Sequence, residues 1–276
     1  CRMPANDMAH GMMDQVLFLA PFLCYVGVVA LITVCVRSQA DDANYFFANK
    51  RLSGLQALLS VISSETSVAT TVVFPAAGLK SGYVLVWLLL GYIAGRSVVA
   101  LFYLRTLYES SRLTIYQTMS ANHRILEGAY LLAKYISGGA RYFVGGYALH
   151  QILGGPVALW IVVVAGCVAA CSLTGGLRAV VVMDQVQSVL IVGTGVILCS
   201  FLYFRVPAGA VHWPSFIDPN PANYTFSPAL FLGGAVLSIG SHGADQDLLL
   251  RILSTRTFRA AQRSLILSGI GAACLI

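Results

Sequence analysis

The sequence predicts an all-α integral membrane protein. Of its 276 residues, 58% are hydrophobic and 10% are charged, whereas an ordinary soluble domain carries about a quarter charged residues. The mean hydropathy is +0.78. Several apolar stretches are also longer than the roughly 18 residues that separate a membrane span from a buried core helix. We therefore expect a set of helices that cross a lipid bilayer.

The apolar stretches give seven full spans and part of an eighth. They lie at about residues 15–36, 54–79, 83–108, 127–153, 157–174, 180–204 and 227–250, and the eighth begins near Ser264. No charge run, short-period repeat or low-complexity tract interrupts the pattern, so residues 1–276 are expected to form a single multi-span membrane domain. Because the chain stops within the eighth span, at Ile276, we expect a C-terminally truncated fragment of a longer protein.

The placement of the basic residues predicts the orientation in the membrane. With the N-terminus outside, the inner loops hold eleven Lys and Arg residues, and the outer segments hold only Arg2, Lys80 and Arg205. An inner excess of this kind follows the positive-inside rule. The orientation in the membrane thus accounts for the net charge of +6, so no nucleic-acid partner is expected. The predicted localisation is the cell membrane (plasma or inner), multi-pass, with an external N-terminus.

The first two spans differ in polarity. The first is uniformly apolar apart from Thr33 and is expected to be a peripheral helix that faces lipid. The second contains Glu65. A carboxylate at mid-membrane depth costs several kcal/mol even on the lower, insertion-based estimates, so it is rarely retained without a function.

Polar residues and helix breakers surround Glu65 in this second span. The hydroxyl-bearing neighbours and the breakers are Ser60, Ser63, Ser64, Thr66, Ser67, Pro75 and Gly78. Unpaired backbone is not tolerated against lipid, so this composition indicates a helix that is interrupted in order to line a cavity. The pattern is typical of a membrane carrier.

The third and fourth spans carry basic residues at membrane depth. In the third, Gly91 and Gly95 have the small-xxx-small spacing that lets a neighbouring helix approach closely. Arg96 lies in the same span and is expected to make a structural pair on the inner side. In the fourth span, Lys134 and Arg141 are a second basic intrusion.

The seventh span is the second one expected to break. A short turn between the fifth and sixth spans ends in Asp184, and the long outer loop at about 205–227 is rich in Pro and Asn. The seventh span then contains Gly-Gly at 233–234 and SIGSHG at 238–243. Interrupted helices at corresponding places, here the second and seventh spans, point to an inverted-repeat transporter with five helices per repeat.

Several segments resemble the sodium:solute symporter family. ANYFFANKRLSGLQALLSVISSETS is similar to the family segment in which an aromatic inner loop leads into a broken helix. SLTGGLRAVVVMDQVQ resembles the family's GG-L-x-A-V-x-x-x-D-x-x-Q segment, and GADQDLLLRILSTRTFRAAQRSLILSG resembles the segment after the broken seventh span. The matches occur in order and cover nearly the whole chain. Family members carry glucose, iodide, proline and sialic acid, so the resemblance does not name a substrate.

The resemblance implies the LeuT-like fold of five-plus-five inverted repeats, of which only the N-terminal part is present here. It also implies sodium sites. By the match of SSET, the backbone carbonyls of Leu59 and Ile62 are ligands of the conserved sodium site, and its hydroxyl pair belongs to a span that this chain lacks. Some members have a further sodium site that uses the aspartate at Asp184. Carbonyls, hydroxyls and carboxylates supply the hard oxygen ligands that sodium requires.

The candidates for solute contact are Ser63, Ser64, Glu65, Thr66 and Arg141. Glu65 is either part of the solute site or gate, or a structural carboxylate that binds backbone N–H groups freed at the break. Ser63 and Thr66, three residues apart, either face one cavity or hydrogen-bond back within the helix.

Arg141 and Asp184 each have two possible roles. Arg141 either clamps an anionic solute, since Arg matches carboxylate geometry bidentately, or it pairs internally with Glu65 or extends toward water. Asp184 is either a sodium or proton ligand, or the partner of Arg178 at the inner mouth.

Together these features favour a sodium-coupled secondary active symporter that imports a small polar organic solute by alternating access, with Na+ as the coupling ion. The alternative is a transporter-like membrane sensor, the input domain of a signalling kinase, which this family also supplies. A membrane enzyme is disfavoured because the sequence has no H-x-x-x-H, G-x-S-x-G or paired-His cluster. We expect His150 and His242 to be satisfied polar residues rather than metal ligands.

Overall fold

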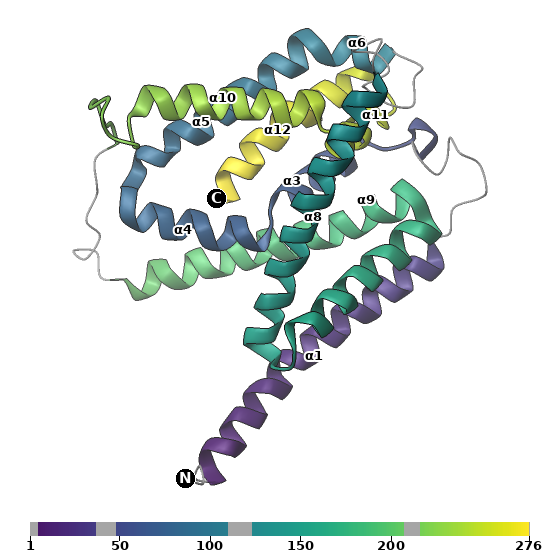
Figure 1. The fold of residues 1–276 in the computed structure, drawn as a ribbon, viewed down its shortest axis with the longest axis vertical. Coiled ribbons are helices and arrows are strands. Elements are labelled where there is room, and N and C mark those ends of the chain that lie inside the picture. Colours follow the sequence, from purple (N-terminus) through teal and green to yellow (C-terminus); the bar gives the residue numbers. More distant parts are fainter. Residues whose placement is uncertain (1–4, 37–47, 110–122, 207–215, 276) are drawn as a thin grey trace.

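The computed structural model describes residues 5–36, 48–109, 123–206 and 216–275 (Figure 1). The first part of the aromatic inner loop, with Arg37, and the segment around Arg112 lie outside these residues. The elements in order are α1 (Ala5–Cys35), η1 (Ala48–Lys50), α3 (Gly54–Glu65), α4 (Val68–Ser81), η2 (Gly82–Leu85), α5 (Val86–Val98), η3, a π-helix (Val99–Tyr103), α6 (Leu104–Glu109), α8 (His123–Leu153), α9 (Val157–Arg205), α10 (Ser227–Ala244), α11 (Gln246–Leu253) and α12 (Phe258–Leu275). The only β-type pairing within the described residues is an isolated bridge between Leu52 and Thr255.

The helices overlap the predicted spans but begin and end at different residues. Among the described residues, Val73–Glu109 and Val157–Arg205 are long and apolar enough to cross a membrane, by length and composition. The second of these is α9, which contains both the fifth and the sixth predicted spans. An unbroken helix of 49 residues would be about 73 Å long, more than twice the roughly 30 Å hydrocarbon core of a bilayer. Gly176 bends it with φ 56° and ψ −155°, a conformation that only glycine adopts readily. Figure 1 shows the two arms on either side of this bend.

The second predicted span is interrupted, as expected, between α3 and α4. Thr66 ends α3 with extended backbone, and its N–H still donates to the carbonyl of Ile62 (3.0 Å). Ser67 then begins α4 through a capping box with Thr70, in which each side chain accepts from the other residue's backbone N–H. The hydroxyl residues therefore make the break, because they satisfy the backbone groups that it frees. Pro75 lies within the continuous helix α4.

The break in the seventh span was misplaced. The glycines at 233–234 and the SIGSHG segment at 238–243 lie inside α10, which is continuous to Ala244. The chain breaks at Asp245, where the backbone is extended and the side chain caps α11 by accepting from the N–H of Asp247 (3.0 Å). An acidic N-cap, rather than the glycines, separates the two helices.

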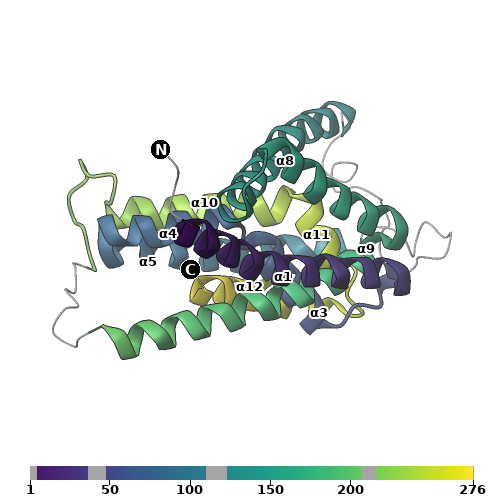
Figure 2. The same cartoon turned by 90° about the horizontal axis from the view of Figure 1, so that it is seen from below.

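The glycines instead allow close contact between α5 and α10, which run side by side (Figures 1 and 2). A Cβ atom at Gly91 would lie 2.0 Å from the carbonyl oxygen of Phe231, and one at Gly234 would lie 2.3 Å from that of Leu88. Gly95 is equally close to α10. The predicted role of Gly91 and Gly95 in close helix approach is confirmed.

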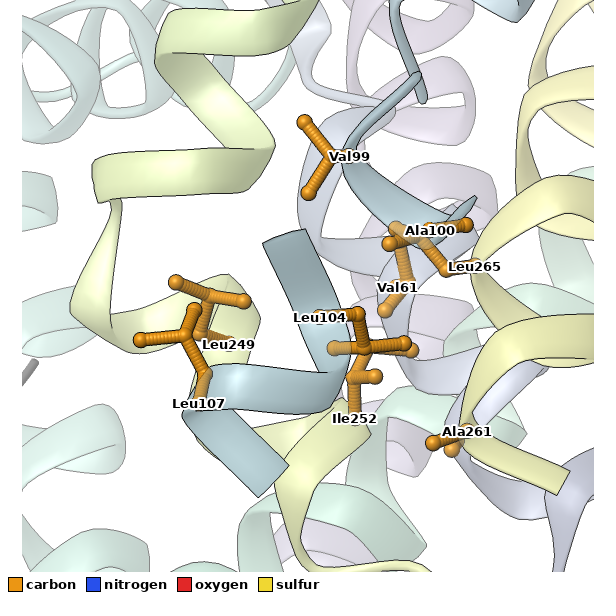
Figure 3. Packing of buried hydrophobic residues seen from close by; sticks show 10 residues of the cluster. Val61, Val99, Ala100, Leu104, Leu107, Leu249, Ile252, Ala261 and Leu265 are labelled. Carbon is orange, nitrogen blue, oxygen red and sulfur yellow. The ribbon is translucent and has the colours of Figure 1, made fainter. Parts of the chain in front are cut away.

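Two of the three apolar clusters among the described residues join the long helices to one another. The larger joins α3, the third predicted span, α11 and α12 (Figure 3), and its buried members are Ala57, Val61, Val99, Ala100, Leu104, Leu107, Leu249, Ile252, Ala261 and Leu265. The smaller joins one side of α1 to α9 through Val29, Ile32, Cys171, Ala179 and Met183. The other side of α1 exposes Leu19, Leu23 and Leu31. The first predicted span thus packs on α9 and leaves its remaining side uncovered by the described residues.

Candidate functional site

The two helix breaks open onto one cavity, which we call the polar cavity. It has a volume of about 200 Å³. Side chains from α3, α5, α8, α10 and α11 line it: Ser64, Glu65, Tyr92, Lys134, Arg141, Ser241, Asp245, Asp247, Leu248 and Arg251. Most of these groups are polar or charged, although they come from helices that the sequence predicts to be membrane spans. Groups of this kind at membrane depth mark solute or ion pathways.

Glu65 is held by a buried ionic network at the end of α3. Its carboxylate forms an ion pair with Arg96 of α5, and its Oε1 lies 2.5 Å from Nε2 of His242 in α10. Arg96 is fully buried, donates to Ser268 Oγ (2.8 Å), and lies over the ring of Tyr92 at 5.2 Å. The network therefore ties four helices, α3, α5, α10 and α12, together beside the first break. Because the Glu65 charge is balanced within the protein, it is not free to bind a cationic solute.

This network corrects two expectations for the partners of Glu65. The partners of Glu65 are Arg96 and His242, neither the backbone N–H groups of the break nor Arg141. Arg96 makes a structural pair, as expected, and its partner is Glu65 in the protein interior. His242 is a satisfied polar residue, as expected, because its Nδ1 also lies 2.9 Å from the carbonyl of Ser238. The sequence signal for the pair was Arg96 itself, since a cation within a span requires a partner.

The hydroxyl residues divide between packing and the cavity. Ser63 is buried and donates to Oε1 of Gln187 in α9 (3.0 Å), and Thr66 donates back to the carbonyl of Ile62 (2.9 Å). Neither lines the polar cavity. Ser64 does line it, although its hydroxyl also donates to the carbonyl of Val61 (2.9 Å). Of the predicted solute contacts, the structure brings together Ser64, Glu65 and Arg141.

The two basic residues of α8 have different environments. Lys134 is 2.8 Å from carboxylate oxygens of both Asp245 and Asp247. It therefore links α8 to the residues where α10 ends and α11 begins. Arg141 lines the cavity with an exposed side chain and forms no ion pair with any described carboxylate. Arg141 is consequently the cation that the surrounding protein leaves available to an anionic ligand.

An oxygen-rich cluster lies where α3 packs on the second arm of α9, and we call it the α3–α9 cluster. Ser60 donates to Asp184, and Ser188 donates to the carbonyl of Leu59 (2.5 Å). The carbonyl of Ile62 accepts from Thr66. The Ile62 carbonyl already accepts from both the N–H and the hydroxyl of Thr66, so a cation at this carbonyl would displace the Thr66 hydroxyl. Carboxylate, hydroxyl and carbonyl oxygens fit the preference of sodium for hard ligands.

The charge of Asp184 is balanced by Arg251 of α11, whose Nε lies 3.1 Å from Oδ2. Arg178, the partner considered from the sequence, is exposed and makes no ion pair with Asp184.

Sequence reasoning also missed Lys134, Asp245 and Asp247 as a group. Their signal was present, because all of them are ionisable residues inside or at the end of predicted spans.

Comparisons with known proteins cover most of the chain. Residues 45–213 match the family model described as sodium:solute symporter family. The sodium/iodide cotransporter of Homo sapiens is 22% identical over 95% of this chain and 43% of its own length. The sodium-coupled monocarboxylate transporter 2 of Mus musculus is 24% identical over 94% of this chain and 44% of its own length. The chain thus spans less than half the length of these curated relatives.

A solved structure shares the fold. A Na+-coupled sialic acid symporter in its substrate-bound outward-open state superimposes with a TM-score of 0.76 and 19% sequence identity. The alignment covers 93% of this chain and 58% of that one. The helices of this chain therefore follow the arrangement of that structure.

Proposed function

The chain belongs to the sodium:solute symporter family, and on that premise we propose that it forms the solute-binding part of a sodium-coupled symporter that imports a small polar organic solute by alternating access. The fold is LeuT-like and all-α. Helices α3/α4 through the second arm of α9 make the first five-helix repeat. The pair α10/α11, followed by α12, begins the second.

The observation that carries this proposal is the meeting of both helix breaks at one polar cavity. In inverted-repeat transporters the solute binds where the discontinuous helices of the two repeats face each other. Here Ser64 and Glu65 end α3, Asp245 separates α10 from α11, and all of them line the same cavity. The matched relatives are transporters and cotransporters by name, which favours transport over the sensor alternative and over an enzyme.

The solute proposed here carries a negative charge. Arg141 is the cavity cation without a protein carboxylate among the described residues, and a guanidinium binds carboxylates bidentately. Two relatives are named for anions, iodide and monocarboxylates. Ser64 and Ser241 also line the cavity; their hydroxyls donate to the carbonyls of Val61 and Leu237, so toward a solute they can accept from a hydroxyl or N–H donor.

Sodium is proposed to bind Asp184 in the α3–α9 cluster, as the further sodium site, whereas the carbonyls of Leu59 and Ile62 are proposed ligands of the conserved sodium site. Sodium at Asp184 would hold α3 against α9 beside the first break and so shape the cavity wall that contains Ser64 and Glu65. The coupling is reciprocal by linkage, so solute must raise the affinity for sodium by the same factor.

Sodium-driven uptake tests the function. We expect full-length protein in proteoliposomes to accumulate at least one member of a panel of radiolabelled small carboxylates, inorganic anions and neutral polar solutes under an inward sodium gradient, and not under a choline gradient. Arg141→Gln is expected to raise the half-saturating concentration of an anionic solute by roughly tenfold or more, because a hydrogen bond to a charged group contributes about 1.5–3 kcal/mol. Arg124→Gln, at an exposed position of the same helix, is the control. Uptake that is indifferent to sodium for every solute would contradict the proposal.

The proposed orientation, multi-pass in the plasma membrane with the N-terminus outside, follows from the basic residues. Asn220 lies in a loop that is proposed to be external, and its backbone N–H, with the Thr225 hydroxyl and the Asn223 amide, donates to Asp218. These bonds, led by that of Thr225, lower the pKa of the Asp218 carboxyl and keep it ionised at neutral pH. In a cysteine-free background, an impermeant thiol reagent added outside intact cells should label Asn220→Cys and leave Arg256→Cys unlabelled. The reverse pattern would invert the topology.

A further inference from the structure

Arg251 stands between the proposed solute and sodium sites. It lines the polar cavity with Glu65 and Arg141. It also lines a second, mostly apolar cavity of about 320 Å³ between α1 and α9, which Asp184 lines as well. Among the described residues that line these two cavities, Arg251 is the only one common to both. A change in its position therefore alters both cavities.

The contacts of Arg251 hold it on Asp184 through a single nitrogen. Its Nε donates to Asp184 Oδ2 (3.1 Å) and to Ser60 Oγ (2.9 Å), and its Nη1 donates to the carbonyl of Asp247 (2.6 Å). Its Nη2 makes no hydrogen bond with a described residue. Arg and carboxylate groups pair most strongly in a bidentate arrangement. The Arg251–Asp184 pair lacks that arrangement, so it is suited to being exchanged.

Sodium and the Arg251 guanidinium require the same carboxylate. Asp184 and Arg251 are largely buried, with 10% and 12% of their side chains exposed. In an interior of low dielectric, two cations in contact with one carboxylate repel each other strongly. One negative charge balances one cation, so sodium at Asp184 weakens the attraction that holds the guanidinium in its present place.

We propose that Arg251 is a tethered competitor of sodium for Asp184, and that sodium turns it toward the polar cavity, where it joins Arg141 in binding the anionic group of the solute. The side chain already borders that cavity, so the turn needs no new entry path into it. This inference rests on the proposed function. It adds a physical origin for coupling, since sodium would create part of the site for the anion and the anion would keep Arg251 away from Asp184.

The test uses sodium alone as the probe. The thermal unfolding of purified full-length protein is followed while sodium chloride replaces choline chloride at constant ionic strength, because a bound ligand raises the melting temperature by mass action. We expect Arg251→Gln to lower the sodium concentration at half-maximal stabilisation by roughly tenfold, since it removes a charged competitor. Arg259→Gln, an exposed arginine on α12, should leave it unchanged, and Arg251→Lys should shift it less.

The outcomes separate the inference from the function. If sodium does not stabilise the unmodified protein, the proposed sodium coupling fails. If sodium stabilises it but Arg251→Gln leaves the midpoint unchanged or raises it, only the competition is wrong. Should Arg251→Gln not fold, Arg251→Gln with Asp184→Asn removes both charges, and a normal sodium response in that double variant would also overturn the proposal. For the solute found by uptake, Arg251→Gln should reduce the gain in affinity that sodium causes, and an undiminished gain would exclude the turn toward the cavity.

Discussion

Replacing Arg96 by methionine is expected to cost about 3–5 kcal/mol of folding stability, because it leaves the Glu65 carboxylate in the protein interior without its guanidinium partner. Arg96 is fully buried and joins Glu65 of α3 to Ser268 of α12. Loss of this link should also free the end of α3 beside the first helix break. We therefore expect uptake to be lost together with stability.

An exposed ion pair serves as the control for the loss of stability in Arg96→Met. Arg105 and Glu109 form an ion pair on α6 with 73% and 64% of their side chains exposed. An exposed pair contributes at most about 1 kcal/mol, so Arg105→Met should scarcely change the thermal unfolding of the detergent-solubilised protein. Glu65→Gln combined with Arg96→Met should recover part of the lost stability, because it removes the unpaired charge. If Arg96→Met is no more harmful than Arg105→Met, the network does not hold the helices together.

The sequence predicts that the helices break, but it does not predict which residues pair with the buried charges. The interruption between α3 and α4 was predictable because hydroxyls that cap helices stand next to Glu65 at a depth where bare backbone is excluded. The break at Asp245 was misplaced because a Gly-Gly pair signals either a helix break or a close helix contact. In this protein Gly234 faces Leu88 of α5, and the contact explains the glycine.

The partner of a buried charge depends on three-dimensional packing. Glu65 is 31 residues from Arg96 and 177 from His242, and one sequence shows only that each charge needs a counterpart. Arg141 was an equally good choice for Glu65 by composition. The same limit applies to Asp184, which is 67 residues from Arg251. Residue types and depth identify the members of the site, whereas the fold decides which of them remain free for a ligand.

Blocking the polar cavity is the second change with a large expected effect. Ser241 lines this cavity on α10, and Ser241→Cys keeps a small side chain there. In a background with the seven native cysteines replaced, a small methanethiosulfonate reagent should modify this position and abolish uptake, because the added group occupies space that the solute needs. Asn220→Cys in the proposed outer loop is the control, and its modification should leave uptake intact.

Protection of Ser241→Cys by the transported solute tests most directly the claim that both helix breaks meet at the solute site. With sodium present and solute at ten times its dissociation constant, about a tenth of the sites are free, so modification should slow by roughly tenfold. Without sodium the protection should weaken, and Asn220→Cys should react at the same rate under all conditions. A modification rate at Ser241→Cys that saturating solute and sodium leave unchanged would contradict the account.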